Sequence, residues 1–291
     1  MKCEIAFSDN SNISLDEEVF KASIQTSDLP KELSFLEKTF DNCSRYSDNL
    51  YLFEQDDLLF GFASIELNED IGIKTKTLYD AILKNVSERK LFRCWNYVPD
   101  INVIEKGEEI YKKFNGGRKD AFNEFYGTGF ETKLPAATGI GIKGNNLVIM
   151  FLAGEENPEH LENPDQCPSY LYPEQYGKKA PGFARATVVS DKFYFISGTA
   201  SIKDHVSMYK GDVKKQYDLM KDNLNTMIAE KKNVDIETAS AIVYYRHEED
   251  LDFIKNSFEK DFPYVKNPVY LESNICRKEL DLEAELSFGF F

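Results

Sequence analysis

The sequence predicts an α+β fold in which one plan, β-β-α-β-α-β-β, is used twice along a single chain. Three observations support this prediction. The length of 291 residues suggests two domains of roughly 150 residues each. Apolar residues make up 42% of the chain, which is enough for a sizeable core. Hydrophobic spacing switches between the strand and helix periods in the same order within residues 49–153 and 184–291.

Residues 1–48 are polar and irregular, with one short apolar segment near Leu33–Phe40. They are expected to form an N-terminal polar extension outside the two units. The first unit is then expected over residues 49–153. Its elements are a hairpin of Tyr51–Phe53 and Leu59–Leu67, a helix over Thr77–Glu88, a strand over Leu91–Val98, a helix over Glu108–Tyr126, and strands over Ala136–Ile142 and Leu147–Leu152.

Two local signals refine this first unit. The pair Gly116-Gly117 should break or kink the second helix, because glycine is a poor helix former. The turn residues Gly144-Asn145-Asn146 are typical of a hairpin, so the last two strands are expected to pair with each other.

A loop rich in proline, glutamate and tyrosine over residues 154–183 separates the first unit from the second, which is expected over residues 184–291. The elements of the second unit are strands over Ala184–Val189 and Lys192–Ser197, a helix over Val213–Glu230, a strand over Thr238–Tyr245, a helix over Glu248–Phe258, and strands over Val269–Ile275 and Leu280–Leu286. Each unit should cover one sheet face with helices and pack the other face against its twin. A pocket is expected where the two sheets meet.

The composition excludes several classes of function. A net charge of −15 argues against nucleic acid and against an anionic membrane surface, because both partners need a basic face. No apolar run approaches the ~20 residues of a spanning helix, and the first residues do not resemble a signal peptide, so a cytoplasmic setting is expected. Five scattered cysteines and three histidines predict neither a disulfide framework nor a zinc site.

Two kinds of residue suit recognition of a small acid. Tyr170, Tyr172 and Tyr176 lie in one proline-bracketed loop, and tyrosine combines a flat apolar ring with a hydroxyl; the alternative is that this loop packs its rings onto the core. Arginine binds carboxylates with two parallel donors, and the chain has only seven arginines. Arg118 and Arg185 are candidate anion clamps, although each could equally be a surface residue.

The last strand alternates leucine or alanine with Asp281, Glu283 and Glu285, which places the three acids on one face. That face either meets solvent or lines a pocket. In a pocket screened from water, the pKa of a carboxyl group rises, and the group can serve as a general acid near neutral pH.

A set of ordered motifs identifies a family. The segments are Arg93–Tyr97, Asp100–Asn102, Gly117-Arg118, Pro135–Thr138, Ser169-Tyr170, Tyr176-Gly177, Phe183–Ala186, Ser197–Ile202, Ile275–Arg277 and Glu283. From about Arg93 to the last residue the chain resembles the chorismatases, which act on chorismate and belong structurally with the YjgF-type reactive-intermediate deaminases. The resemblance implies two YjgF/chorismate-mutase-like units packed sheet to sheet.

The resemblance also implies roles for individual residues. Glu283 would protonate the substrate in a pocket between the units, and the carboxylates and ring would be held by Arg118, Arg185, Tyr170, Tyr172 and Tyr176. Gly198 and Cys276 match positions that sort the family by product, and together they resemble the branch that makes 3-hydroxybenzoate and pyruvate. Cys276 would shape the pocket and would not act as a nucleophile. No metal or organic cofactor is implied, and a duplicated chain is expected to be a monomer.

Alternatives stay open at this point. Within the family, chorismate could be hydrolysed to a dihydroxycyclohexadiene carboxylate and pyruvate, or 4-hydroxybenzoate could be a co-product. Outside it, the chain could be a YjgF-type imine or enamine deaminase, although Pro268–Leu271 lacks the arginine that those proteins carry there. The fold could also serve as a non-catalytic binder of small acids.

Overall fold

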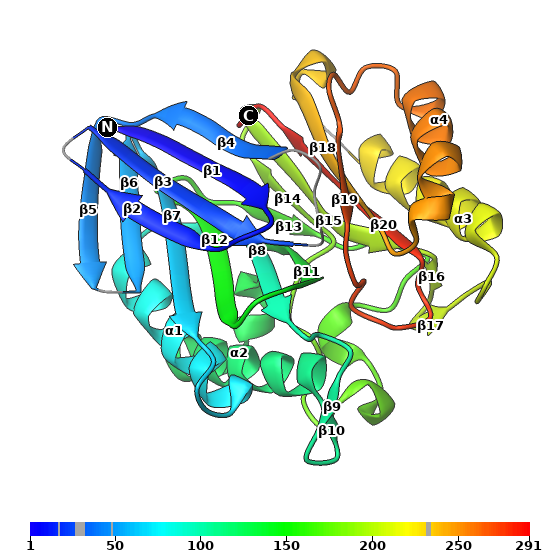
Figure 1. The fold of residues 1–291 in the computed structure, drawn as a ribbon, viewed down its shortest axis with the longest axis horizontal. Helices are drawn as coiled ribbons and strands as arrows, with labels where there is room; N and C mark the ends of the chain where they lie inside the picture. Colours follow the sequence, from blue (N-terminus) through cyan, green and yellow to red (C-terminus); the bar gives the residue numbers. More distant parts are fainter. Residues whose placement is uncertain (17, 27–32, 48, 231–233) are drawn as a thin grey trace.

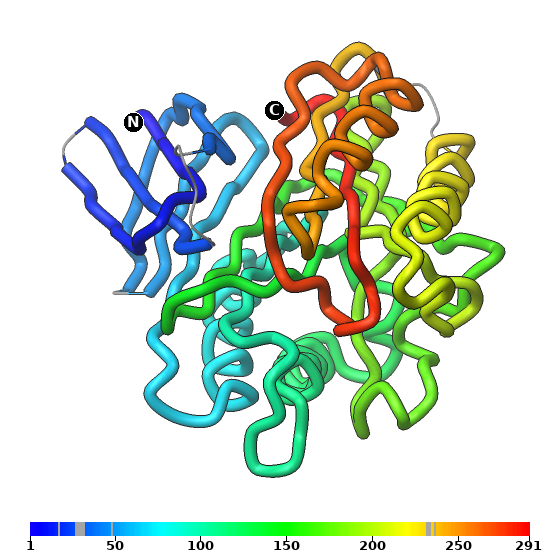
Figure 2. The backbone as a smooth tube through the Cα atoms, turned by 45° about the vertical axis from the view of Figure 1, so that its right-hand side comes forward, coloured from blue at the N-terminus to red at the C-terminus, as the bar shows by residue number. Residues whose placement is uncertain are grey.

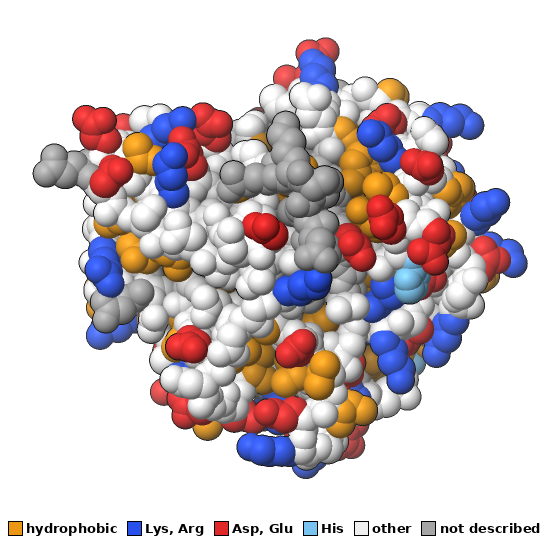
Figure 3. Space-filling view, viewed as in Figure 1, with side chains coloured by type: hydrophobic (Ala, Val, Ile, Leu, Met, Phe, Trp, Pro, Cys, Tyr) orange, Lys and Arg blue, Asp and Glu red, His pale blue; other side chains and the backbone are white. Residues whose placement is uncertain are grey.

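The computed structural model describes residues 1–16, 18–26, 33–47, 49–230 and 234–291. Three β-sheets surround a shared apolar interior, and the α-helices lie on the outside (Figure 1). In Figure 2 the N-terminal strands, drawn in blue, lie at one side of the molecule. On the face drawn in Figure 3, basic and acidic side chains are interspersed, so the acidic excess forms no large single-sign patch there.

The first unit has the predicted order of elements. They are β6 (Leu50–Gln55), β7 (Leu58–Glu66), α1 (Ile71–Val86), β8 (Lys90–Pro99), α2 (Ile110–Tyr126), β11 (Ala136–Ile142) and β12 (Asn146–Gly154). The strands of this unit, with β5 (Asn42–Ser47) at one edge, form a six-stranded sheet in the order β11-β8-β12-β7-β6-β5. A small hairpin of β9 (Ile104–Glu105) and β10 (Glu108-Glu109) precedes α2.

The second unit repeats the plan with the same strand order. Its elements are β14 (Ala186–Val189), β15 (Phe193–Ala200), α3 (Val213–Ala229), β18 (Ala239–Tyr245), α4 (Leu251–Asp261), β19 (Val269–Glu272) and β20 (Leu282–Phe288), with β13 (Glu159–Leu161) at the edge and a short hairpin of β16 (Ile202-Lys203) and β17 (Val206-Ser207). The sheet runs β13-β14-β15-β20-β18-β19, so β20 occupies the place that β12 holds in the first unit. The α+β fold class and its twofold plan are therefore confirmed.

The expected pairing of the last two strands of the first unit is wrong. β8 lies between them: it pairs in parallel with β11 and antiparallel with β12. The turn at Gly144-Asn145-Asn146 therefore carries the chain across β8 instead of closing a hairpin. Turn residues specify a reversal of direction, whereas burial on both faces decides which strand becomes the neighbour.

The expected break at Gly116-Gly117 is also wrong, because α2 continues through both glycines. A Cβ on Gly117 would overlap the main-chain oxygen of Gly72 on α1. The glycine therefore serves close packing of the two helices, and that packing compensates for its low helix propensity.

The expectation that residues 1–48 are irregular is corrected by the structure. Strands β1 (Lys2–Ser8), β2 (Asn12–Leu15), β3 (Val19–Gln25) and β4 (Leu33–Thr39) form a sheet in the order β2-β3-β1-β4. One face is apolar, as Cys3, Ile5 and Phe7 of β1 show, whereas Glu4 and Ala6 between them are only partly buried. Alternation over residues 2–7 lowers the average hydrophobicity of the segment and still builds a buried face. The segment boundaries after residues 48, 153 and 183 stay a prediction.

The main core is shared by all three sheets. It contains side chains such as Phe7 from β1, Trp95 from β8 and Phe195 from β15. Each six-stranded sheet also has one smaller core between its outer face and its helices. The two units also touch edge to edge through bridges from Ala136 to Ala184 and from Ile140 to Ile275. Within the described part of the chain, no helix is both long and apolar enough to cross a membrane.

Candidate active site

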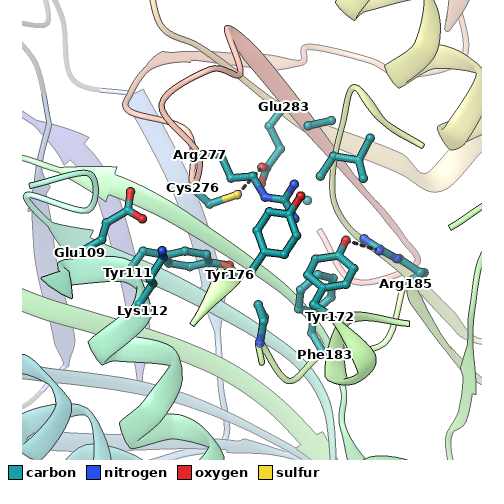
Figure 4. Close-up of a pocket in the computed structure, with 14 residues that line it drawn as sticks. Glu109, Tyr111, Lys112, Tyr172, Tyr176, Phe183, Arg185, Cys276, Arg277 and Glu283 are labelled. Carbon is teal, nitrogen blue, oxygen red and sulfur yellow. Dashed lines mark hydrogen bonds between the residues drawn. The ribbon is translucent and has the colours of Figure 1, made fainter. Parts of the chain in front are cut away.

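A cavity with about 570 Å³ of empty space, counted out to its mouth, lies between the two units. It is walled by the start of α2, the tyrosine-rich loop, β15, β20 and the segment that precedes β20 (Figure 4). Six of the eight predicted site residues line it: Tyr172, Tyr176, Arg185, Gly198, Cys276 and Glu283. Residues predicted from distant parts of the sequence are thus brought together at the junction of the units.

Glu283 points into this cavity from β20 (Figure 4). The strand is paired on both sides, with Glu283 opposite Ala200 of β15 and Tyr244 of β18, and only 4% of the residue is exposed. The interpretation of the acidic face as solvated is therefore wrong. Burial, followed by the charge of Glu285, raises the pKa of Glu283 to about 8, against the opposing effect of Arg93. Near neutral pH this carboxyl group holds a proton that it can donate.

The thiol of Cys276 lies 3.8 Å from Glu283 Oε2 and donates a hydrogen bond to it. Burial, followed by the charge of Glu283, raises the pKa of Cys276 far above its usual range. A protonated thiol is a weak nucleophile.

Gly198 faces Glu283 across the pair of strands. A Cβ at this position would overlap Glu283 Oε1 and would come within 3.1 Å of Thr138 Cγ2. The main-chain N–H of Gly198 donates to Thr138 Oγ1 at 3.0 Å. The absence of a side chain at 198 therefore sets the rotamer that Glu283 adopts.

Arg185, just before β14, is held by the tyrosine-rich loop over residues 154–183. Its Nη2 donates to the hydroxyl of Tyr172 at 2.7 Å and to the main-chain oxygen of Cys167 at 3.0 Å. The guanidinium also lies 5.2 Å from the ring centre of Phe183. Glu162 Oε2 is 4.0 Å from Arg185 Nε, and burial raises the pKa of this carboxyl group to about 7. The arginine is thus fixed in place and only weakly neutralised.

Arg277 is a cavity residue that the sequence reasoning did not select. Its guanidinium carbon lies 4.0 Å from the ring centre of Tyr176 and 5.2 Å from that of Tyr172. Nη1 donates to the main-chain oxygen of His205 at 2.8 Å and to Ser207 Oγ at 3.1 Å. Its position next to Cys276 was the available signal. Tyr111 and Lys112 were also missed, because only tertiary packing brings the first turn of α2 to this cavity.

Arg118 and Tyr170 do not line the cavity. Arg118 is buried on α2, where its Nη2 donates to Asn115 Oδ1 at 3.0 Å and its guanidinium lies over Phe114. Tyr170 packs against the core beneath the first sheet. Their roles in substrate binding stay a prediction. Among the described residues, no group of three or more histidine, cysteine, aspartate or glutamate side chains could hold a metal ion.

Fold and site together define a duplicated α+β protein that carries a buried acid, two arginines and three tyrosines in a cavity between its units. Residues 39–153 match a family model described as "Chorismatase FkbO/Hyg5-like, N-terminal". A chorismatase of Streptomyces hygroscopicus is 31% identical over 247 residues, which are 79% of this chain and 71% of that protein. The chain belongs to the chorismatase family.

Other relatives agree with this assignment. A 3-hydroxybenzoate synthase of Streptomyces hygroscopicus is 34% identical over 223 residues, which are 70% of this chain but only 65% of that protein. A crystal structure of a chorismatase superposes with a TM-score of 0.87 at 26% identity and covers 98% of this chain and 92% of its own.

Proposed function

We propose that this protein converts chorismate to 3-hydroxybenzoate and pyruvate, with Glu283 as the general acid and with no cofactor. The observation that carries the proposal is a carboxyl group that stays protonated up to a pH of about 8 at the wall of an arginine-lined cavity. The relative that is a 3-hydroxybenzoate synthase supports the choice of product.

The reaction asks little of the protein beyond proton transfer. Chorismate carries two carboxylates and an enolpyruvyl ether beside a ring hydroxyl. A proton from Glu283 adds to the methylene carbon of the enolpyruvyl group, the bond between the ether oxygen and the ring breaks, and pyruvate leaves with that oxygen. The oxygen of the neighbouring ring hydroxyl moves to the vacated ring carbon, that carbon loses its hydrogen as a proton, and one proton returns to Glu283. Aromatisation of the ring provides the driving force. The atoms of 3-hydroxybenzoic acid and pyruvic acid sum to those of chorismic acid, so no water, oxidant or reductant is consumed.

In the proposed complex, the cavity arginines bind the carboxylates of chorismate and the tyrosines contact its ring. Arg185 and Arg277 are the cavity arginines that suit the two carboxylates, because a guanidinium offers paired donors to each. Tyr172 and Tyr176 provide flat faces for the ring, and the two tyrosine rings lie 5.3 Å apart at an angle of 48°. We assign Arg118 and Tyr170 to the supporting layer of this binding region.

Exclusion of water favours the aromatic product over the diol. Hydrolysis to the dihydroxycyclohexadiene carboxylate adds one water, whereas formation of 3-hydroxybenzoate adds none. Ala200, Ile202 and Phe183 give the cavity apolar walls, and the thiol of Cys276 fills the space beside Glu283. Apolar surface around the reacting carbons disfavours an attacking water and strengthens the charge interactions there.

The test is incubation of the full chain with chorismate, followed by separate measurement of pyruvate and of the ring product. Release of pyruvate with 3-hydroxybenzoate supports the proposal. Pyruvate with the diol, or with 4-hydroxybenzoate as the main product, overturns the product assignment, and no pyruvate at all overturns the activity.

Glu283→Gln tests the role of the acid. It should lower kcat by more than about tenfold, because general acid catalysis is worth that much or more. Asp281→Asn is the matched control, since Asp281 lies two residues before Glu283 and outside the cavity. Full activity of Glu283→Gln would contradict the assignment.

A further inference from the structure

A second carboxylate lies behind the acid. Glu285 is two residues beyond Glu283 on β20, so both side chains leave the same face of the strand, and Glu285 is only 2% exposed. Its Oε1 accepts from Trp95 Nε1 at 2.7 Å, and its Oε2 accepts from Arg93 Nη2 at 2.9 Å and from the Tyr244 hydroxyl at 3.2 Å. Donors therefore meet both oxygens of Glu285, and one of these donors is the charged guanidinium of Arg93.

This cluster connects directly to the wall of the cavity. Arg93 Nη2 also donates to Thr138 Oγ1, and the same oxygen accepts the main-chain N–H of Gly198. Arg93 and Thr138 belong to the first unit, whereas Glu285 and Gly198 belong to the second. The ion pair thus joins the units at the point where Gly198 faces Glu283.

The ion pair is poorly explained by stability alone. Arg93 is fully buried, and its Nε and Nη1 have no hydrogen-bond partner among the described residues. A buried ion pair with incomplete hydrogen bonding seldom stabilises a fold more than apolar side chains of equal size would. A role in the chemistry accounts better for charges at this position.

The groups that face Glu283 come from five elements. Glu285 lies on β20, Arg93 on β8, Tyr111 on α2, Arg185 just before β14, and Cys276 on the segment before β20. Among the charged groups, Glu285 has the largest effect on Glu283; it raises the pKa, while Arg93 and Arg185 lower it. Among the charged neighbours of Glu283, Glu285 therefore has the greatest influence on whether Glu283 keeps its proton.

We propose that Glu285 is a positioning residue, whose fixed negative charge, clamped by Arg93, Trp95 and Tyr244, keeps the proton on Glu283 ready for transfer. The inference rests on the proposed function, in which Glu283 is the acid. Glu285 touches neither the cavity nor the substrate, since it does not line the cavity, and it acts only through its neighbour.

The test uses the full chain with Glu285→Gln and measures the pH profile of kcat/KM. Removal of the charge leaves Arg93 unneutralised, so both changes lower the pKa of Glu283. The alkaline limb of the profile should move down by about one pH unit or more. Ser287→Ala, at the next inward position of the same strand, is the control and should leave the limb in place.

Glu285→Gln leaves the buried Arg93 without its ion-pair partner, so this variant can fail to fold. In that case Arg93→Met with Glu285→Gln removes both charges while the glutamine still accepts from Trp95, and the limb should again move down, by a smaller amount. An unmoved limb in whichever variant folds overturns the inference.

A second measurement separates this inference from the proposed function. Titration of the Glu283 carboxyl band by infrared difference, assigned with Glu283→Gln, needs no turnover. If the wild type makes no pyruvate, the proposed function fails. If the Glu283 carboxyl titrates at the same pH with and without the charge at 285, the role of Glu285 fails.

Discussion

Gly198→Ala tests how tightly the geometry of the acid is set. The new Cβ would lie 2.8 Å from Glu283 Cδ and 3.1 Å from Thr138 Cγ2, and it would overlap Glu283 Oε1. Thr138 is held by Arg93 and by the N–H of residue 198, so the carboxyl group of Glu283 is the part that must move. A shift of about 1 Å in a reacting group costs on the order of 100-fold in rate, or about 2.7 kcal/mol of transition-state stabilisation.

The assay for this variant is steady-state release of pyruvate from chorismate, with the ring product identified at each time point. We expect kcat to fall by about 100-fold and KM to change little, because the substrate-binding side chains are untouched. Gly116→Ala is the matched control: a Cβ there meets only Lys179 Cδ at 3.9 Å, so activity should be unchanged. A kcat for Gly198→Ala within about threefold of wild type would refute the steric reasoning.

Four further predictions follow from the same structure. Activity should decline as the pH rises through about 8, where Glu283 loses its proton. Glu283→Gln should raise Tm, increasingly so from pH 5 to pH 8, because the unfolded glutamate ionises near its usual pKa of 4.5 while the folded one holds its proton. Arg277→Lys should raise KM by about tenfold with kcat nearly unchanged, because lysine loses the stacking on Tyr176. Gly117→Ala should destabilise the fold by about 1–3 kcal/mol in thermal melts, whereas Gly116→Ala should not.

The order of elements could be predicted because each element carries its own period. The helix at α3 buries Tyr217, Met220 and Leu224 at a spacing of three or four residues, and the strands around it alternate or are continuously apolar. The neighbour of each strand could not be predicted in the same way. β8 separates β11 from β12 because of contacts made by the whole sheet, and the turn between them carries no information on that insertion.

The sequence analysis also did not predict the short N-terminal strands, each of which has one polar face. β3 places Phe20, Ala22 and Ile24 on the core with charged or polar residues between them, and this averages to an unremarkable polar segment. Its partner β1 lies ahead of it in the sequence, and the apolar face becomes evident only when the third sheet is assembled.

The site residues also fall into those marked by a local sequence pattern and those brought in by tertiary packing. Alternation in the closing strand is a local signal that marked Asp281, Glu283 and Glu285, and the resemblance to the chorismatases selected Glu283 among them. The tyrosine loop was found because three rings lie close together in sequence. Tyr111 and Arg277 reach the cavity only because α2 and the segment before β20 meet across the two units. Arg118 has the expected charge and spacing, but its helix turns it into the layer below the cavity, towards Asn115.

The position of β20 has a consequence for biosynthesis. This strand enters between β15 and β18, which the ribosome has already released. Until it inserts, both neighbours expose an unpaired edge, and such non-local pairing forms slowly. β20 also carries Glu283, so a nascent or truncated chain that lacks this strand lacks the proposed general acid. Under that proposal, catalytic competence and closure of the second sheet are acquired in one step, and a partly folded chain does not consume its substrate.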